Sequence, residues 1–162
     1  MTLIDSLQET DFGRMLITFI VAMLPVLELR GAIPLGVSIG LGHWLSMLIS
    51  VLGNMIPVPF IILFIRRVFE WLRSKSVWLE RAVSSMEKRA EGKWEKVHRY
   101  QLLGLMVLVA IPLPGTGAWT GALVAAIMGI RLKHAIPAIF LGVLIAGVLV
   151  TGITYGFFAI FQ

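Results

Sequence analysis

Two charged residues inside an apolar segment are the first feature of this sequence that could do chemistry. Glu28 and Arg30 are the only Asp, Glu, Lys or Arg residues from Met15 to Ile65. Charges in such a segment are costly to bury and are functional by default when they face a cavity. We expect extended backbone between Pro25 and Pro34, and residues i and i+2 of extended backbone project to the same side. Glu28 and Arg30 should therefore share one small polar site.

The types of these side chains suggest their roles. A carboxylate can take up and release a proton, so Glu28 is the predicted proton-coupling group. The guanidinium of Arg30 suits a two-point contact with phosphate, so Arg30 is predicted to bind substrate or to act as a counter-ion. Asn54 is the nearest other uncharged polar residue able to line the site. The alternative is a structural Glu28–Arg30 pair, because buried ion pairs need not be functional.

A stretch from Pro112 to Gly117, rich in proline and glycine, carries no charge. Successive glycines before a helix leave backbone N–H groups free for an anion or a headgroup phosphate. Gly115, Thr116 and Gly117 are therefore predicted substrate-binding residues. A tight turn without a ligand is the alternative.

The composition indicates the solvent that these sites face. Of 162 residues, 58% are hydrophobic and 14% are charged, whereas roughly 25% are charged in an average soluble domain. Disorder is excluded as well, because disordered chains are polar and charge-rich. The composition therefore predicts an integral membrane protein. The length holds about four spans of ~20 residues plus one polar segment, which makes a single membrane domain.

The net charge of +5 comes from one segment. Residues 66–99 hold ten of the fourteen Lys and Arg residues and five Glu, and the rest of the chain sums to zero. By the positive-inside rule this segment is cytoplasmic and faces anionic headgroups. Its apolar residues recur at helical spacing. We therefore predict a basic amphipathic helix on the membrane surface and no binding of nucleic acid.

The basic segment 66–99 is a linker between two apolar halves, residues 15–65 and 100–162. These halves resemble each other. Three matches recur at an offset of 89 or 90 residues: Gly31-Ala32 with Gly121-Ala122, Gly40-Leu41 with Gly129-Ile130, and Gly53 with Gly142. Paired segments broken by glycine and proline at equivalent places indicate an internally repeated transporter with its site at the break.

Each half contains a short, broken apolar block and a long, uninterrupted one. Met15–Gly42 and Gln101–Ile130 are too short for two passes of ~20 residues each, which predicts re-entrant helical hairpins. Trp44–Ile65 and Ala135–Gln162 are long enough to span the membrane. The predicted fold is all-α, with two inverted repeats, each a re-entrant hairpin plus a transmembrane helix, joined by the cytoplasmic amphipathic helix. Both termini are then outside; the rival is four plain spans with both termini inside.

No catalytic residue, cofactor or metal site is predicted. Gly36 to Gly40 matches the G-x-S-x-G pattern of serine hydrolases but lacks the strand-turn-helix context of that motif. An intramembrane aspartyl protease needs two carboxylates, and three scattered histidines do not make a metal site. The absence of cysteine from the sequence excludes thiolate zinc sites and cysteine nucleophiles.

The run from Glu28 to Gly36, followed by Gly53-Asn54, Pro57 and the stretch from Pro112 to Gly121, resembles the small multidrug export proteins, which are similar to the DedA family. The likeness covers nearly the whole chain. It implies inverted repeats with re-entrant hairpins and the movement of amphipathic or lipid-phosphate substrates with the proton gradient. The implied site residues are Glu28 and Arg30. The second hairpin has no arginine, in which it departs from DedA proteins.

We therefore predict a multi-pass protein of a bacterial or archaeal cell membrane. It transports or flips an amphipathic substrate, a lipid phosphate or a lipophilic drug-like molecule, with coupling to protons. The predicted partners are membrane lipids, this substrate and protons, and a homodimer stays open. The contending prediction is a membrane-organising protein that transports nothing, in which the Glu28–Arg30 pair is structural and the basic helix acts on the membrane.

Overall fold

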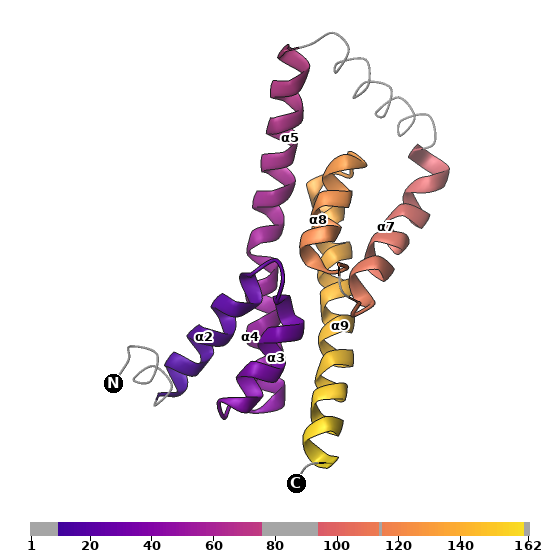
Figure 1. Cartoon of the computed structure of the whole chain (residues 1–162). Helices are drawn as coiled ribbons and strands as arrows, with labels where there is room; N and C mark the ends of the chain where they lie inside the picture. The colour runs from indigo at the N-terminus through magenta and orange to yellow at the C-terminus, as the bar shows by residue number, and fades with distance from the viewer. Residues whose placement is uncertain (1–9, 76–93, 114, 161–162) are drawn as a thin grey trace.

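The computed structural model describes residues 10–75, 94–113 and 115–160, and its regular secondary structure is entirely α-helical (Figure 1). The first half contains α2 (Asp11–Met23), α3 (Glu28–Ser38), α4 (His43–Met55) and α5 (Pro57–Lys75). The second half contains α7 (Trp94–Ala110), α8 (Ala118–Ile127) and α9 (Leu132–Ile160). The prediction of an all-helical chain is confirmed for the described residues.

Proline determines where the first helix of each half ends. α2 ends at Met23, just before Leu24 and Pro25, and α7 ends at Ala110, shortly before Pro112. Proline has no backbone N–H and disfavours helical backbone in the residue before it. Both interruptions lie where the sequence predicts them.

Two helical stretches are long and apolar enough to cross a membrane. They are His43–Ile65, which joins α4 to the first part of α5, and Leu132–Gly156 in α9. Both coincide with the predicted spans apart from their ends. Large apolar side chains on these helices are exposed, for example Trp44, Phe60 and Ile153. Soluble proteins rarely expose large contiguous apolar areas, whereas lipid is a suitable solvent for them.

The turn that ends α3 recurs at the end of α8. Gly40 and Gly129 have positive φ angles of 96° and 66°. The N–H groups of Leu41 and Ile130, the residues that follow, each donate to the carbonyl five residues back at 2.9 Å. This is the Schellman arrangement that glycine favours at helix ends. The sequence match between these glycines is therefore also a structural match.

A second recurring detail is the close packing of α4 on α2 and of α9 on α7. A Cβ added to Gly53 would lie 2.5 Å from the carbonyl oxygen of Phe19 in α2. A Cβ added to Gly142 would lie 2.7 Å from the carbonyl oxygen of Met106 in α7. Both glycines therefore let a long helix approach the backbone of the first helix of its half.

The two halves pack together through α4 and α9, which contact each other, while α5 contacts α8 and α3 contacts α9 (Figure 1). Small and branched residues such as Ala122, Ile139 and Val143 fill the core between them. In Figure 1 the end of α5 and the start of α7 lie at one end of the molecule, and the start of α2 and the end of α9 lie at the other.

The backbone around Glu28 differs from the sequence prediction. The segment from Pro25 to Pro34 is not extended, because α3 begins at Glu28 and continues through Pro34. A proline inside a helix removes one backbone hydrogen bond, here the bond to the carbonyl of Arg30, and its ring crowds that carbonyl. Glu28 has a positive φ of 46°. The side chains of Glu28 and Arg30 can reach one site because α3 starts irregularly, and not because its backbone is extended.

The helices that flank the predicted linker extend into it. α5 continues through Arg66 to Lys75, and α7 begins at Trp94, whereas the sequence analysis assigned residues 66–99 to the linker. Residues 76–93 lie outside the described residues, and with them most of the predicted amphipathic helix.

Candidate functional site

The starts of α3 and α8 meet, and Glu28 and Arg30 make the contact. One carboxylate oxygen of Glu28 accepts a hydrogen bond from the backbone N–H of Trp119 at 3.2 Å. The guanidinium of Arg30 donates to the carbonyl of Thr116 and, at 3.0 Å, to the hydroxyl of Thr116. Both charged side chains at the start of α3 therefore bind the second half.

The start of α8 is a suitable place for a carboxylate. The first N–H groups of a helix have no partner within the helix and carry a partial positive charge. The residue before α8 is Gly117, which has no side chain to cap them. Glu28 supplies the acceptor from the other half of the chain. It is only 5% exposed, so little water competes for this interaction.

Gly117 is required for this approach. A Cβ at this position would overlap the carboxylate of Glu28. Gly117 also has a φ of 142° and a ψ of −165°, a region that essentially only glycine adopts. The contact therefore depends on the absence of a side chain at Gly117.

The loop before α8, to which Arg30 donates its hydrogen bonds, is ordered by hydrogen bonds of its own. The hydroxyl of Thr116 lies 2.6 Å from the carbonyl oxygen of Ile111 and 2.9 Å from that of Leu113. The hydroxyl of Thr120 donates to the carbonyl of Gly115 at 2.9 Å. Arg30 thus binds a loop that is held in place by its own hydrogen bonds.

Trp119 belongs to this site, and the sequence analysis missed it. Its indole N–H donates to the carbonyl of Met23, the last residue of α2, at 3.1 Å. Trp119 therefore joins the start of α8 to both α2 and α3. A tryptophan in the middle of an apolar block, away from the interfacial belts where this residue gathers, was the signal.

The structure brings four of the six predicted site residues together: Glu28, Arg30, Thr116 and Gly117. Gly115 lies on the exposed side of the loop with a φ of 84°. Asn54 is fully buried in α4, and neither polar atom of its side chain has a hydrogen-bond partner among the described residues. The carboxylate of Glu28 accepts from the backbone N–H of Trp119, in the first turn of α8, and the N–H of Thr116 donates to the carbonyl of Leu113 within the loop. Within the described residues there is no group of three or more His, Asp or Glu residues that could hold a metal ion.

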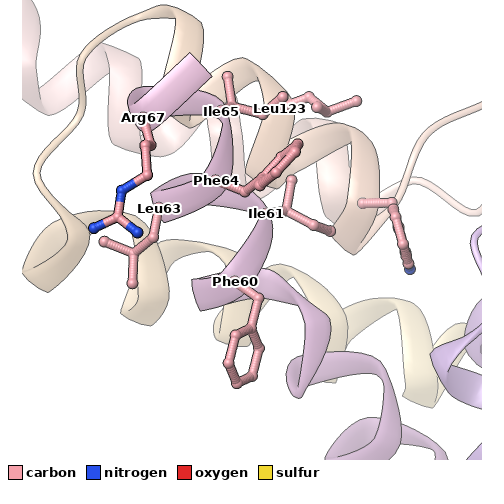
Figure 2. A pocket seen from close by; sticks show the side chains of 8 residues that line it. Phe60, Ile61, Leu63, Phe64, Ile65, Arg67 and Leu123 are labelled. Atoms are coloured by element: carbon pink, nitrogen blue, oxygen red, sulfur yellow. The ribbon is translucent and has the colours of Figure 1, made fainter. Parts of the chain in front are cut away.

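A groove of about 870 Å³ lies between α5 and α8, next to the contact (Figure 2). Its size is that of a small-molecule site. The lining is apolar apart from one guanidinium and consists of Phe60, Ile61, Leu63, Phe64, Ile65, Arg67, Trp119 and Leu123. In Figure 2 Phe64 points toward the helix that carries Leu123, whereas Arg67 points away from it. Trp119 connects the groove to Glu28, since it lines the groove and its backbone N–H donates to the carboxylate of Glu28.

A comparison with protein families matches residues 28–149 to the family described as "Putative small multi-drug export protein". The match begins at Glu28 and includes Arg30, Asn54 and the whole loop before α8. The chain belongs to this family. No curated protein and no solved structure shows a significant match. Membership of a small multi-drug export family, together with the two long apolar helices, indicates a membrane protein with a general role in transport.

Proposed function

We propose that this chain is a proton-coupled transporter for an amphipathic substrate with an anionic headgroup. The observation that carries the proposal is the hydrogen bond between the carboxylate of Glu28 and the first turn of α8 in the other half. The proposed architecture is two inverted repeats whose re-entrant hairpins meet at this contact. The equivalent turns at Gly40 and Gly129 and the equivalent packing at Gly53 and Gly142 support it. The proposed location is the cell membrane, with several passes.

Protonation of Glu28 would act on the contact between the halves. The carboxylate is stabilised by the positive end of α8, whereas the protonated form carries no charge and is held less strongly. Once Glu28 is neutral, the start of α8 and the guanidinium of Arg30 can bind the oxygens of a phosphate. The proton and the anionic headgroup then bind together, which links the movement of one to the movement of the other.

The groove between α5 and α8 provides room for the apolar part of such a substrate. Phe60, Phe64 and Leu123 offer an apolar surface to an alkyl chain. Arg67 lies in the basic segment predicted to be cytoplasmic, where it attracts an anion and repels a lipophilic cation. Trp119 places the groove beside Glu28. These features favour a lipid-phosphate-like substrate over a cationic drug.

Transport in reconstituted vesicles tests the proposal. We expect the protein to move a fluorescent phosphatidic acid across the membrane in response to an imposed pH gradient and to move the matching neutral diacylglycerol much more slowly. Glu28→Gln should abolish the dependence on the gradient. Asp11→Asn is the matched control, because Asp11 is an exposed carboxylate that pairs with Arg14 at the surface. Gradient-dependent transport by Glu28→Gln at the rate of the unmodified protein would refute the coupling role.

A second candidate is the membrane-organising protein, in which the same pair is structural. It is favoured by the fact that Glu28 and Arg30 make their hydrogen bonds within the protein. In that case the unmodified protein transports neither probe, and Glu28→Gln only lowers its stability. Reversal of the charges of Lys88, Arg89, Lys93 and Lys96 would then remove the effect on the membrane.

A further inference from the structure

Three buried polar side chains form a line along α4. Ser46, Ser50 and Asn54 are spaced by four residues, so they share one face of the helix, and each is 0% exposed. Both serine hydroxyls and both polar atoms of the Asn54 amide have no hydrogen-bond partner among the described residues. Buried polar side chains are nearly always partnered by protein or by ordered water. Three in a row therefore point to a ligand.

The line faces small residues of α3. A Cβ added to Gly36 would lie 2.5 Å from the hydroxyl oxygen of Ser46, so these two residues touch. α3 and α4 run antiparallel over a short turn and both rise about 1.5 Å per residue. The register set by Gly36 and Ser46 therefore places Ala32 level with Ser50, and Glu28 level with Asn54. We call the interface between these two rows the α3–α4 seam; its inner end is the carboxylate of Glu28, which contacts the start of α8.

The unpartnered atoms indicate which ligand fits. Serine hydroxyls can donate and accept, and the amide of Asn54 offers a donor and an acceptor. A metal cation would use only the oxygens and would leave the donors without a partner. Water molecules satisfy both kinds of group, and a polar buried site with several partners is where ordered water occurs.

We propose that the α3–α4 seam is a water-filled path that conducts protons between the end of α4 at His43 and the carboxylate of Glu28. That these protons drive transport at Glu28 rests on the proposed function, whereas the hydration of the seam does not. The path begins at the face of the membrane that is predicted to be the outer one.

Titratable and charged groups lie at both ends of the seam. At the outer end, the Nε2 atom of His43 is buried and has no hydrogen-bond partner in the part of the chain that the structure describes. The His43 ring stands edge-on to that of Tyr155 of α9, with the centroids 5.2 Å apart. The guanidinium of Arg14 in α2 lies beside Gly40, within 3.2 Å of a Cβ built there. At the inner end are Glu28 and Arg30. Protons can therefore enter near His43 and leave at Glu28.

Labelling of single cysteines tests the hydration, and the natural chain contains no cysteine that would react. Ser50→Cys in the seam is compared with Ala122→Cys, which is equally buried at 0% exposure but lies in the apolar core. Methanethiosulfonate ethylammonium added outside intact vesicles should modify Ser50→Cys at least roughly tenfold faster, because only a hydrated thiol ionises. Ser46→Cys should behave like Ser50→Cys. Equal protection of all three cysteines would overturn the proposal. If sodium ions blocked the labelling of the seam cysteines, the seam would hold a cation in place of water, and this result would also overturn the proposal.

A pair of substitutions at Ser50 tests conduction. Threonine and valine have the same shape, so Ser50→Thr and Ser50→Val crowd the seam equally and differ only in the hydroxyl. Ser50→Val should lower gradient-driven movement of fluorescent phosphatidic acid by roughly tenfold or more, since proton transfer needs positioned hydrogen-bonding groups. Ser50→Thr should stay close to the unmodified protein. Equal losses would assign Ser50 to packing. The two proposals can fail separately. If the seam cysteines are labelled but Glu28→Gln still transports in response to the gradient, the seam is hydrated and only the proposed function is refuted.

Discussion

At the scale of single residues, Gly117 is the position at which the contact between the halves forbids a side chain. Gly117→Ala should destabilise the protein by roughly 3 kcal/mol or more, because the methyl group overlaps the Glu28 carboxylate and the backbone angles are strained. Gly115→Ala is the matched control: its φ is also positive, but a Cβ there meets nothing within 4 Å, so it should cost about 1–2 kcal/mol. Thermal unfolding in detergent measures both.

A double variant separates overlap from strain at Gly117. Glu28→Ala in the Gly117→Ala background removes the overlap and leaves the strain. The two substitutions should therefore cost less together than the sum of their separate effects. Additive effects would show that Gly117 does not crowd Glu28.

Arg30 allows a second test at this scale. Arg30→Ala should destabilise the protein by about 1.5–3 kcal/mol, the usual value of hydrogen bonds to a charged group. Arg30→Lys should recover only part of this loss, because an ammonium cannot reproduce the contact of one planar guanidinium with the carbonyl and the hydroxyl of Thr116. Arg131→Ala, an exposed arginine, serves as the control. Equal unfolding temperatures for all three variants would contradict the contact.

The sequence identifies Glu28 and Arg30, because isolated charges in an apolar block are visible without a structure. It does not identify Trp119, whose role arises only when the starts of α3 and α8 meet. Nor does it show that the carboxylate of Glu28 accepts from the backbone N–H of Trp119 at the start of α8. Such contacts between distant segments depend on tertiary packing and leave no local pattern.

At the scale of the elements, Gly53 and Gly142 set how closely the long helices approach α2 and α7. Gly53→Ala and Gly142→Ala should each cost about 1–3 kcal/mol, since the added methyl group meets a backbone carbonyl that cannot easily move. Gly104→Ala in α7 meets nothing within 4 Å and should be stabilising by about 0.4–1 kcal/mol. Unfolding temperatures of the three variants check this, and a loss for Gly104→Ala equal to the other two would contradict it.

The positions of the helices are largely predictable, because Pro25 and Pro112 mark the breaks and long apolar blocks mark the spans. The conformation around Pro34 is not. The local preference of proline favours extended backbone before it, but in an apolar environment each unpaired backbone group is costly. A helix that continues through Pro34 loses one hydrogen bond, whereas an extended segment would lose several.

At the scale of the whole molecule, the account predicts that both termini lie on the outer face of the membrane and the basic linker on the inner face. Cysteines placed singly at Met1 and Gln162 should react with an impermeant reagent in intact cells, and one at Ser85 should react only after permeabilisation. The physical reason is that two hairpins returning to their own side leave one crossing per half. Termini that react only after permeabilisation would favour four plain spans.

The central claim is that an anionic headgroup binds together with a proton at Glu28. The most direct test is the number of protons taken up when dihexanoyl phosphatidic acid binds to the purified protein, measured by titration calorimetry in buffers that differ in their heat of ionisation. The account predicts proton uptake by the unmodified protein and none by Glu28→Gln, which should still bind. Dihexanoylglycerol, with the same tails and no charge, should cause no uptake in either protein. Equal proton uptake by the unmodified protein and by Glu28→Gln would contradict the account.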